Sequence, residues 1–534
     1  MGYSTPMRPL HAVADELGIS PDHLLPWGPG RAKIAPDALG PAKGRLVLVS
    51  AITPTPAGEG KTTMSIALAM GLRKRSRKVA LALREPSMGP VFGRKGGGTG
   101  GGKATIEPAE SINLHFTGDM HAITSAHNLL AALVDHALEH RTGPDARRTR
   151  WRRVVDVNDR ALRRVLVGLE GVPRETGFDI TAASEVMASL CLAEDRADLE
   201  ARLARLIVGE DATGKRVTAA DLQGVGAMSA LLNEAMMPNL VQTAEGGAAI
   251  LHGGPFANIA HGCNSRIATR MALAHADIVL SEAGFAFDLG GEKFLDIKAR
   301  ADGLWPALVV LVVTRRALLW HGQGSLSAGL DLLQHHLKAI ARFGLEPMVL
   351  LNRFPDDTAE DIAAIAAFCS NEAVAFSPCD GFGAGGDGAL AAADVLTTTL
   401  DAVPRDRPPR WLYPLDMPLR DKLDTLSREM YAGSGAILDD AATKDLARVE
   451  ALGGGSLPIC VAKTQLSLTD DPKRKGLVTG HALHVRELRL HAGAGFVVAL
   501  AGDVQTMPGL PKEPAARRIH VDATGRIRGL MQEG

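Results

Sequence analysis

Residues 53–62 have the types and spacing needed to hold a phosphate. They read Thr-Pro-Thr-Pro-Ala-Gly-Glu-Gly-Lys-Thr, follow an apolar run at 45–52 and precede another at 64–72 that suits a helix packed on a sheet. In a strand, glycine-rich loop and helix of this kind, backbone N–H groups face the phosphates, the lysine neutralises charge and the hydroxyl reaches Mg²⁺. The segment therefore predicts a nucleotide site with Lys61 on the β- and γ-phosphates and Thr62 on Mg²⁺.

The segment departs from the usual phosphate-loop pattern at its start. Thr55 stands where glycine is usual, six residues before the lysine, and a proline flanks it on each side. Because proline fixes φ and has no N–H to donate, we expect this end of the loop to be stiff. Gly58 and Gly60 still allow the backbone to approach a ligand closely. A glycine-rich turn that binds nothing is the alternative interpretation.

Composition and charge limit the classes of function. The chain has 534 residues, 46% of them hydrophobic, enough for about two to four domains with large cores. Its 59 basic and 60 acidic residues give a net charge of −1, which argues against nucleic acid or an anionic membrane as a partner. Five cysteines form no CxxC pair, residues 1–26 hold no signal-peptide core, and no apolar run approaches the roughly 20 residues that span a bilayer. We expect a cytoplasmic protein that binds neither nucleic acid nor a membrane.

Apolar runs that alternate with helical patterns predict the fold. The expected strands lie at residues 45–52, 78–83, 112–119, 277–282, 307–314 and 347–354. The expected helices lie at residues 121–140, 181–206, 219–236, 326–343, 358–370, 416–432 and 439–452. Continuous apolar strands between helices indicate a parallel sheet buried on both faces. The prediction is an α/β fold: a P-loop NTPase-like parallel sheet flanked by helices, with additional smaller α/β domains.

Three domains are expected along the chain. A nucleotide-binding α/β domain spans 1–320 and carries a helical insertion at about 140–236. A second α/β domain spans 321–405, and a proline-rich break precedes a C-terminal α/β domain at 406–534. The glycine tract at 93–103 is either a linker or a loop ordered by a ligand, and its place directly after a strand favours the ligand.

From about residue 40 to its end, the sequence resembles the formate–tetrahydrofolate ligase family. The blocks that carry the resemblance are long and ordered, and lie at residues 53–63, 83–93, 113–119, 154–163, 252–265, 352–355, 462–465, 485–490 and 506–512. The resemblance implies that MgATP, formate and tetrahydrofolate give ADP, phosphate and 10-formyltetrahydrofolate through formyl phosphate. It also implies activation by a monovalent cation such as K⁺ or NH₄⁺, and a homotetramer.

The resemblance assigns the ATP and formate contacts. It implies ATP contacts along the whole glycine-rich segment, at Thr53, Pro54, Thr55, Pro56, Ala57, Gly58, Glu59, Gly60, Lys61 and Thr62. Arg84, at a strand end, suits formate and the acyl phosphate because guanidinium binds planar oxyanions bidentately. A structural ion pair of Arg84 with Glu85 or Asp119 is the alternative. Lys61 and Arg84 are the expected catalytic residues.

The resemblance also places a folate site, to which the 321–405 domain contributes. Glu85 and Asp119, expected at neighbouring strand ends, would hold donors of the reduced pterin or order Mg²⁺ through water. Phe354 matches a stacking phenylalanine of the family, and Phe382 stands where the family has tryptophan.

Further residues depart from the family pattern, among them Lys103 and Phe287. Lys103 replaces a usual tyrosine and either adds charge near the phosphates or points to solvent. Phe287 replaces a residue that is commonly small.

Several polar residues can be explained by a structural or surface role, without catalysis or binding. Neither His115, His121 and His127 nor His252, His261 and Cys263 have a recognised zinc spacing. The basic run at 141–164 is expected to be a solvated face or a subunit contact rather than an RNA site. Asp277, Glu282 and Asp288 could be surface carboxylates.

Two other functions remain as alternatives to the ligase. One is a different enzyme on the same fold, such as a P-loop kinase or an ATP-dependent carboxylase. The other is a nucleotide-binding regulator, or an RNA-binding protein that has lost the enzyme activity, and it rests on the basic run at 141–164.

Overall fold

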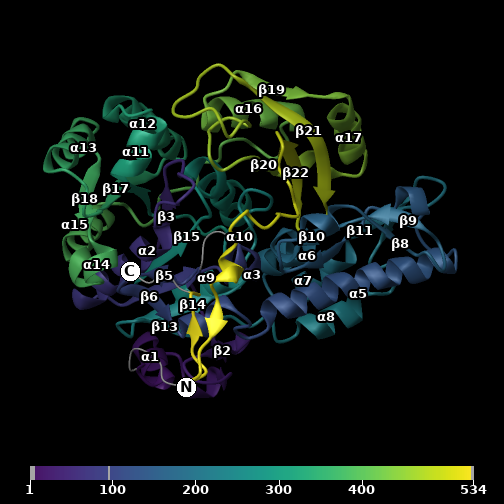
Figure 1. Ribbon diagram of the computed structural model, residues 1–534, viewed down its shortest axis with the longest axis horizontal. Helices are drawn as coiled ribbons and strands as arrows, with labels where there is room; N and C mark the ends of the chain where they lie inside the picture. The colour runs from purple at the N-terminus through teal and green to yellow at the C-terminus, as the bar shows by residue number, and fades with distance from the viewer. Residues whose placement is uncertain (1–6, 94–96, 531–534) are drawn as a thin grey trace.

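One large mixed sheet organises the computed structural model, which describes residues 7–93 and 97–530 (Figure 1). Residues 94–96, in the middle of the glycine tract, lie outside the described residues. In the described part this sheet has 12 strands. Its order is β1 (Leu24–Pro26), β2 (Ala32–Ile34), β13 (Asn239–Thr243), β14 (Ala248–Leu251), β4 (Val79–Leu83), β15 (Ile278–Glu282), β3 (Arg45–Ala51), β16 (Leu308–Val313), β17 (Glu346–Asn352) and β18 (Ala375–Cys379), with β5 (Gly100–Gly101) and β6 (Ala104–Glu107) beside β13.

The strands from β14 to β18 run parallel, and helices cover both faces of the sheet. Successive residues of β3 alternate between two cores: Leu46 and Leu48 join one, Val47 and Val49 the other. The first core contains α9 (Arg266–His275) and α12 (Leu326–Arg342), and the second contains α2 (Lys61–Lys74) and α15 (Leu390–Asp401). The predicted α/β fold with a parallel-dominated, doubly covered sheet is therefore confirmed.

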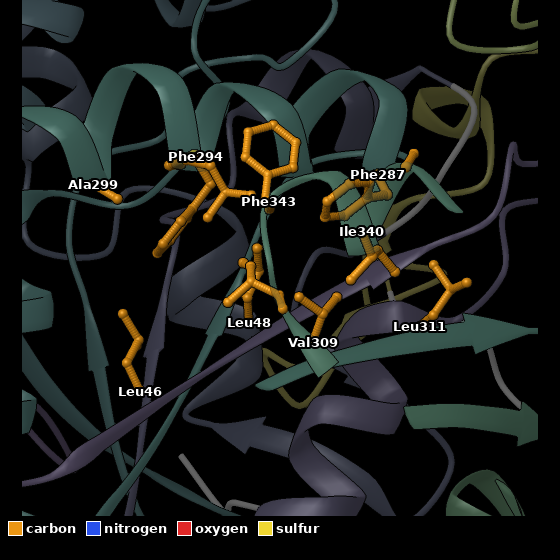
Figure 2. Close-up of a cluster of buried hydrophobic side chains, with 14 of the residues drawn as sticks. Leu46, Leu48, Phe287, Phe294, Ala299, Val309, Leu311, Ile340 and Phe343 are labelled. Carbon is orange, nitrogen blue, oxygen red and sulfur yellow. The ribbon is translucent and has the colours of Figure 1, made fainter. Parts of the chain in front are cut away.

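Figure 2 shows part of the first core. Phe287 is fully buried there, with its ring edge-on to Phe343 at 6.0 Å between centroids. Phe287 lies in a π-helical segment (Phe287–Gly291) that is followed by a second one (Phe294–Ala299). This departure from the family pattern is thus a packing residue of the core, which gains from the burial of a large ring.

The predicted strands at 45–52, 78–83, 277–282, 307–314 and 347–354 are confirmed as β3, β4, β15, β16 and β17. The predicted strand at 112–119 is wrong. The chain forms α4 (Ala109–Asn113) and a turn, in which Phe116 and Gly118 have positive φ, and α5 (Asp119–Glu139) then begins. Left-handed residues interrupt an extended strand, so the turn overrides the β propensity of this segment.

The segment between β6 and β13 forms a lobe around α5 (Figure 1). The predicted helices near 181–206 appear as α6 (Glu185–Leu192) and α7 (Arg196–Ala204), and 219–236 contains α8 (Val225–Leu232). The lobe also has short paired strands: β7 (Arg153–Val155), β8 (Val165–Val167), β9 (Arg174–Thr176), β10 (Phe178–Ile180), β11 (Ile207–Glu210) and β12 (Arg216–Thr218). It is therefore mixed rather than purely helical.

The C-terminal part has its own four-stranded sheet in the order β19 (Gly435–Leu438), β21 (Ala482–His491), β22 (Phe496–Ala501) and β20 (Ile459–Ala462). Helices α16 (Leu419–Tyr431) and α17 (Asp440–Ala451) confirm the predicted helices at 416–432 and 439–452. The remaining elements are α1 (Leu10–Leu17), α3 (Met88–Phe92), α10 (Arg300–Asp302), α11 (Arg315–His321), α13 (Ala359–Asn371), α14 (Gly381–Ala384), β23 (His520–Val521) and β24 (Ile527–Arg528). Within the described ranges, no helix combines the length and apolar character that crossing a bilayer requires.

Candidate functional site

The glycine-rich segment connects β3 to α2 at the carboxyl edge of the parallel strands, and α2 begins at Lys61 as predicted. Gly58 and Gly60 have φ of 79° and 72°. A Cβ at Gly60 would also lie 2.5 Å from Asn352 Nδ2, so both the backbone angle and the close approach require glycine. The loop therefore delivers the N-terminus of a 14-residue helix to the sheet edge, an arrangement suited to an anion.

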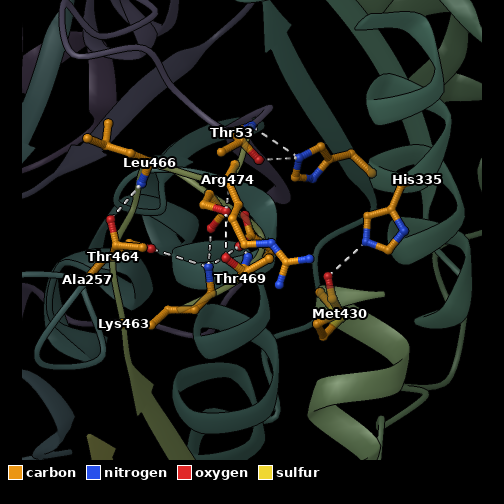
Figure 3. Close-up of polar contacts among 12 residues, drawn as sticks. Thr53, Ala257, His335, Met430, Lys463, Thr464, Leu466, Thr469 and Arg474 are labelled. Carbon is orange, nitrogen blue, oxygen red and sulfur yellow. Dashed lines mark hydrogen bonds and ion pairs between the residues drawn. The ribbon is translucent and has the colours of Figure 1, made fainter. Parts of the chain in front are cut away.

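Side chains from the elements that follow β15 in the chain hold the loop. His336 Nε2 accepts the Thr53 N–H at 3.1 Å (Figure 3). His321 Nε2 lies 3.3 Å from the Pro54 carbonyl oxygen, Arg316 Nη2 donates to the Gly58 carbonyl at 2.9 Å, and Asn352 Nδ2 donates to the Glu59 carbonyl at 3.1 Å. The loop is therefore contacted by side chains of other elements from Thr53 to Glu59, and the stiffness expected at its start from the prolines stays a prediction.

The C-terminal part contacts the elements that carry these side chains. The Gly476 N–H donates to His321 Nδ1 at 3.3 Å, and His335 Nε2 lies 2.9 Å from the Met430 carbonyl oxygen (Figure 3). Lys463 forms a fully buried ion pair with Asp288 at 3.0 Å. Asp288 is therefore a buried, paired group, and the expectation of a surface carboxylate is wrong for it.

Glu282, at the end of β15, is the residue of this site that the sequence did not reveal. It is 6% exposed, so the expectation of a surface carboxylate is wrong here too. Its Oε2 accepts a hydrogen bond of 3.1 Å from Thr62 Oγ1, while Oε1 has no hydrogen-bond partner among the described residues. A hydroxyl and a carboxylate oxygen at one point fit the oxygen ligands that Mg²⁺ prefers. The signal available in sequence was a carboxylate at the end of a buried strand.

Arg84 lies on the other side of Glu282, because β15 separates β4 from β3. Its Nη1 donates to the Pro255 carbonyl at 2.9 Å, and burial lowers its pKa although the nearby Glu282 charge opposes the shift. A Cβ on Gly284 would lie 3.0 and 3.1 Å from the two terminal guanidinium nitrogens, so the glycine leaves room beside them. The ion pair with Asp119 considered from the sequence does not form, since Asp119 pairs with Lys33 instead.

Glu85 and Asp119 lie close together, but they are held differently. Asp119 begins α5, so its predicted position at a strand end is wrong. Its two oxygens accept from Lys33 Nζ at 2.7 Å and Asn239 Nδ2 at 2.8 Å. Glu85 is 3% exposed, and its Oε2 has no hydrogen-bond partner in the described part of the chain. Burial, followed by the Asp119 charge, raises the pKa of Glu85 well above its usual range.

The two predicted aromatic residues follow neighbouring strands, β17 and β18. The Arg316 guanidinium lies over the Phe354 ring at 5.0 Å, which covers one face of that ring. Phe382 is 40% exposed and packs on the glycine tract: its carbonyl accepts the Lys103 N–H at 2.9 Å. The Lys103 side chain is exposed.

The structure shows the surroundings of the acidic and metal-ligating side chains and of the basic run. No group of three or more His, Cys, Asp or Glu side chains in the described ranges is arranged to hold a metal ion. Members of the basic run pair with carboxylates: Arg153 with Asp135 at 2.5 Å and Arg164 with Glu175 at 2.7 Å. Ion pairs of this exposed kind contribute little energy, and the interpretation of the run as a solvated face or a subunit contact stays a prediction.

A separate cavity of about 310 Å³ lies between the α5 lobe and the C-terminal part. The residues that line it include Trp151, Arg152, Glu185 and Arg489, and none of them belongs to the glycine-rich loop. Arg152 pairs with Asp179 and Arg489 with Glu487, so these guanidinium groups already have anionic partners.

Comparisons with known proteins bear on what the site does. The chain matches the family model described as formate–tetrahydrofolate ligase over residues 2–531. It is 56% identical to the formate–tetrahydrofolate ligase of Myxococcus xanthus, over 98% of this chain and 99% of that protein. It is 51% identical to the protein of the same name from Beijerinckia indica and 50% identical to that from Hyphomonas neptunium, each over 98% of both chains.

Proposed function

The chain belongs to the formate–tetrahydrofolate ligase family, and from this premise we propose which of its residues carry the ATP-dependent ligation of formate to tetrahydrofolate. The observation that supports the proposal is the meeting of three adjacent strand ends. The glycine-rich loop follows β3, Glu282 ends β15 and Arg84 follows β4. The phosphate-binding loop, a carboxylate that can bind a metal and a guanidinium that can bind an oxyanion thereby lie at the same edge of the sheet.

The loop with Lys61 and Thr62 binds ATP, in a P-loop NTPase-like arrangement. Its helix N-terminus and Lys61 place positive charge on the β- and γ-phosphates, which is what phosphoryl transfer chiefly requires of a protein. Thr62 and Glu282 would hold Mg²⁺, and the ion would supply positive charge to the phosphate oxygens. Oxygen ligands alone suit Mg²⁺ better than a softer metal.

Arg84 binds formate and then the acyl phosphate. Formate is a poor electrophile, and phosphorylation of one of its oxygens gives the carbon a phosphate leaving group. The N10 amine of tetrahydrofolate attacks that carbon, phosphate leaves, and 10-formyltetrahydrofolate results. Arg84 contributes two parallel donors and a fixed orientation, which holds the reacting atoms in line.

The folate site that we propose draws on separate strand ends: the aromatic residues follow β17 and β18, whereas Glu85 follows β4. Phe354, which is half-buried with the Arg316 guanidinium over its ring, and Phe382 from the neighbouring loop stack on the pterin. Glu85 accepts the hydrogen bonds of pterin donors with its unpartnered oxygen. Asp119, whose oxygens are already engaged by Lys33 and Asn239, contributes chiefly through its charge on Glu85.

The assignment is tested by assaying formation of 10-formyltetrahydrofolate in the wild type and in Lys61→Ala and Arg84→Ala. We expect each variant to lose roughly 10²- to 10³-fold in kcat/KM, the usual result of removing a group that stabilises transition-state charge. Lys74→Ala, at the opposite end of the same helix, is the matched control and should retain activity. A wild-type rate in Lys61→Ala would refute this site.

Assembly, location and activation follow the family expectation. We infer a cytoplasmic homotetramer activated by K⁺ or NH₄⁺. Five free cysteines, all buried, support a reducing compartment. Native mass spectrometry tests the tetramer, and activity in potassium against sodium salts at equal ionic strength tests the activation.

The division into units at 1–320, 321–405 and 406–534 stays a proposal. The separate four-stranded sheet supports a distinct C-terminal unit, whereas β17 and β18 of the middle unit extend the large sheet. Limited proteolysis at 403–410 should release the C-terminal unit first.

A further inference from the structure

We propose that Glu59 is a positioning residue: with Thr314 as its partner, it holds the start of the nucleotide loop in its phosphate-binding shape before a nucleotide arrives. The proposal rests on the proposed function of that loop. It gives the Glu59 side chain a role other than direct contact with ATP.

The Glu59 carboxylate is turned into the protein and is 2% exposed. Its Oε1 accepts the Thr55 N–H at 2.7 Å, and its Oε2 accepts the Thr314 hydroxyl. Its own carbonyl oxygen accepts from Asn352 Nδ2. Main chain and side chain of one residue are thus tied to the loop start, to the end of β16 and to the end of β17.

This brace explains the unusual start of the loop. In a common phosphate loop the residue six places before the lysine is glycine, whereas Thr55 stands there and gives its N–H to Glu59. The flanking residues Pro54 and Pro56 have no N–H to offer. Three consecutive residues therefore present no free backbone donor to a phosphate, and phosphate binding is left to the turn at Gly60 and to the start of α2.

Charge also argues against direct contact between the Glu59 carboxylate and ATP. Two negative groups in a site of low dielectric repel each other strongly, and a buried carboxylate is tolerated only when its oxygens are hydrogen-bonded. Both oxygens of Glu59 meet that condition inside the protein.

Thr314 is suited to be the fixed end of the brace. It caps α11, where its Oγ1 accepts the Ala317 N–H at 2.9 Å while its hydroxyl hydrogen goes to Glu59. The following turn of α11 carries Arg316, whose guanidinium holds the Gly58 carbonyl. Helix α11 and its cap residue therefore hold the loop directly at Gly58 and, through the Glu59 carboxylate, at Thr55.

The test compares conservative with truncating variants. Glu59→Gln can keep both hydrogen bonds, because its amide oxygen accepts from Thr55 N–H and its amide hydrogens turn to Thr314 Oγ1. Glu59→Ala loses both. In the same way Thr314→Ser keeps the hydroxyl and Thr314→Val loses it. A role that depends on charge would instead make Gln as harmful as Ala.

MgADP dissociation constants by calorimetry, together with KM for ATP and kcat, are the measurements. We expect Glu59→Ala and Thr314→Val to weaken MgADP binding roughly tenfold and to raise KM for ATP more than they lower kcat. Glu59→Gln and Thr314→Ser should stay within about threefold of wild type. The double variant Glu59→Ala with Thr314→Val should bind about as well as either single variant, since both remove one brace.

Each other outcome overturns a definite statement. If Lys61→Ala abolishes MgADP binding but Glu59→Ala leaves it unchanged, the brace is wrong and the nucleotide site stands. If Lys61→Ala leaves binding unchanged as well, the proposed function of the loop fails. If Glu59→Ala does not fold, the Thr314→Ser and Thr314→Val pair decides, because equal affinities in those two variants refute the brace.

Discussion

Two buried glutamates lie on opposite sides of the candidate site, and the difference between them separates positioning from binding. Both oxygens of Glu59 are engaged within the protein, by Thr55 and Thr314. Glu85, equally buried, leaves Oε2 without a partner among the described residues, and burial raises its pKa well above the usual range. Most buried polar atoms in folded proteins are hydrogen-bonded, so the unpartnered Glu85 Oε2 supports the proposed role of this carboxyl group in binding a ligand. The Glu59 carboxylate is therefore satisfied before substrate binds, and the Glu85 carboxylate is not.

The largest effect should come from breaking the pair that satisfies Asp119. Lys33→Met leaves the Asp119 carboxylate buried beside Glu85 without its cation, because Lys33 and Asp119 are both almost fully buried. We expect a loss of about 3–5 kcal/mol in the free energy of unfolding, measured by urea denaturation. Adding Asp119→Leu to Lys33→Met should recover much of that loss. If Lys33→Met instead has the free energy of unfolding of the wild type, the pair does not stabilise the fold. Asp119 would then not differ from Glu85 in being held by the protein.

A third buried glutamate, Glu185, sharpens the comparison from outside the site. Its Oε1 accepts the Gly493 N–H at 2.8 Å, and burial raises its pKa from 4.5 to about 8. Between those two pH values the folded protein retains a proton that the unfolded chain has lost. Stability therefore falls as pH rises through this window, by at most about 1.4 kcal/mol per pH unit, and levels off above pH 8.

Glu185→Gln should remove that part of the pH dependence. Urea denaturation at pH 5.5, 7 and 8.5 should show the variant gaining on wild type as pH rises, while KM for tetrahydrofolate stays the same. A change in KM for tetrahydrofolate would show that Glu185 is coupled to the folate site, and it could then not serve as the comparison outside that site.

The same contrast marks the limit of what the sequence could reveal. Strand, glycine-rich loop and helix were predictable because each rests on local pattern: an apolar run, Gly58 and Gly60, and the start of α2 at Lys61. The packed parallel sheet followed from its continuous apolar strands. By contrast, the hydrogen bond between Thr62 and Glu282 joins residues 220 positions apart, and no local pattern contains it.

Two errors have different causes, one local and one distant in sequence. The strand predicted at 112–119 failed because a turn with left-handed residues precedes α5. The exposure predicted for Asp288 failed because its partner, Lys463, comes from the C-terminal part. Partners distant in sequence decide whether a carboxylate is solvated, paired or unpartnered.

Glu85→Leu should separate binding from stability. Leucine fills the space but accepts no hydrogen bond from the pterin, so KM for tetrahydrofolate should rise roughly 10- to 30-fold, while KM for ATP stays the same. The free energy of unfolding should not fall, because the change removes an unpartnered buried acid. Glu59→Ala should do the opposite: it should raise KM for ATP and leave KM for tetrahydrofolate the same. If both variants raise both KM values, the two glutamates do not divide positioning from binding.

The smallest effect concerns the aromatic side of the proposed folate site, where the resemblance predicts Phe382 in place of a tryptophan of the family. Phe382 is 40% exposed and its ring lies against the glycine tract, so a larger ring can extend toward solvent without displacing the core. An indole adds stacking area, and we expect Phe382→Trp to lower KM for tetrahydrofolate about two- to threefold, in line with an aromatic contact of roughly 0.5 kcal/mol.

Phe382→Ala should raise that KM by more, with unchanged thermal unfolding because the side chain is not part of the core. Steady-state kinetics at saturating ATP and formate measure both variants. If neither substitution changes the folate KM, Phe382 is not part of the stacking pair. Glu85 and Phe354 would then have to orient the pterin without it.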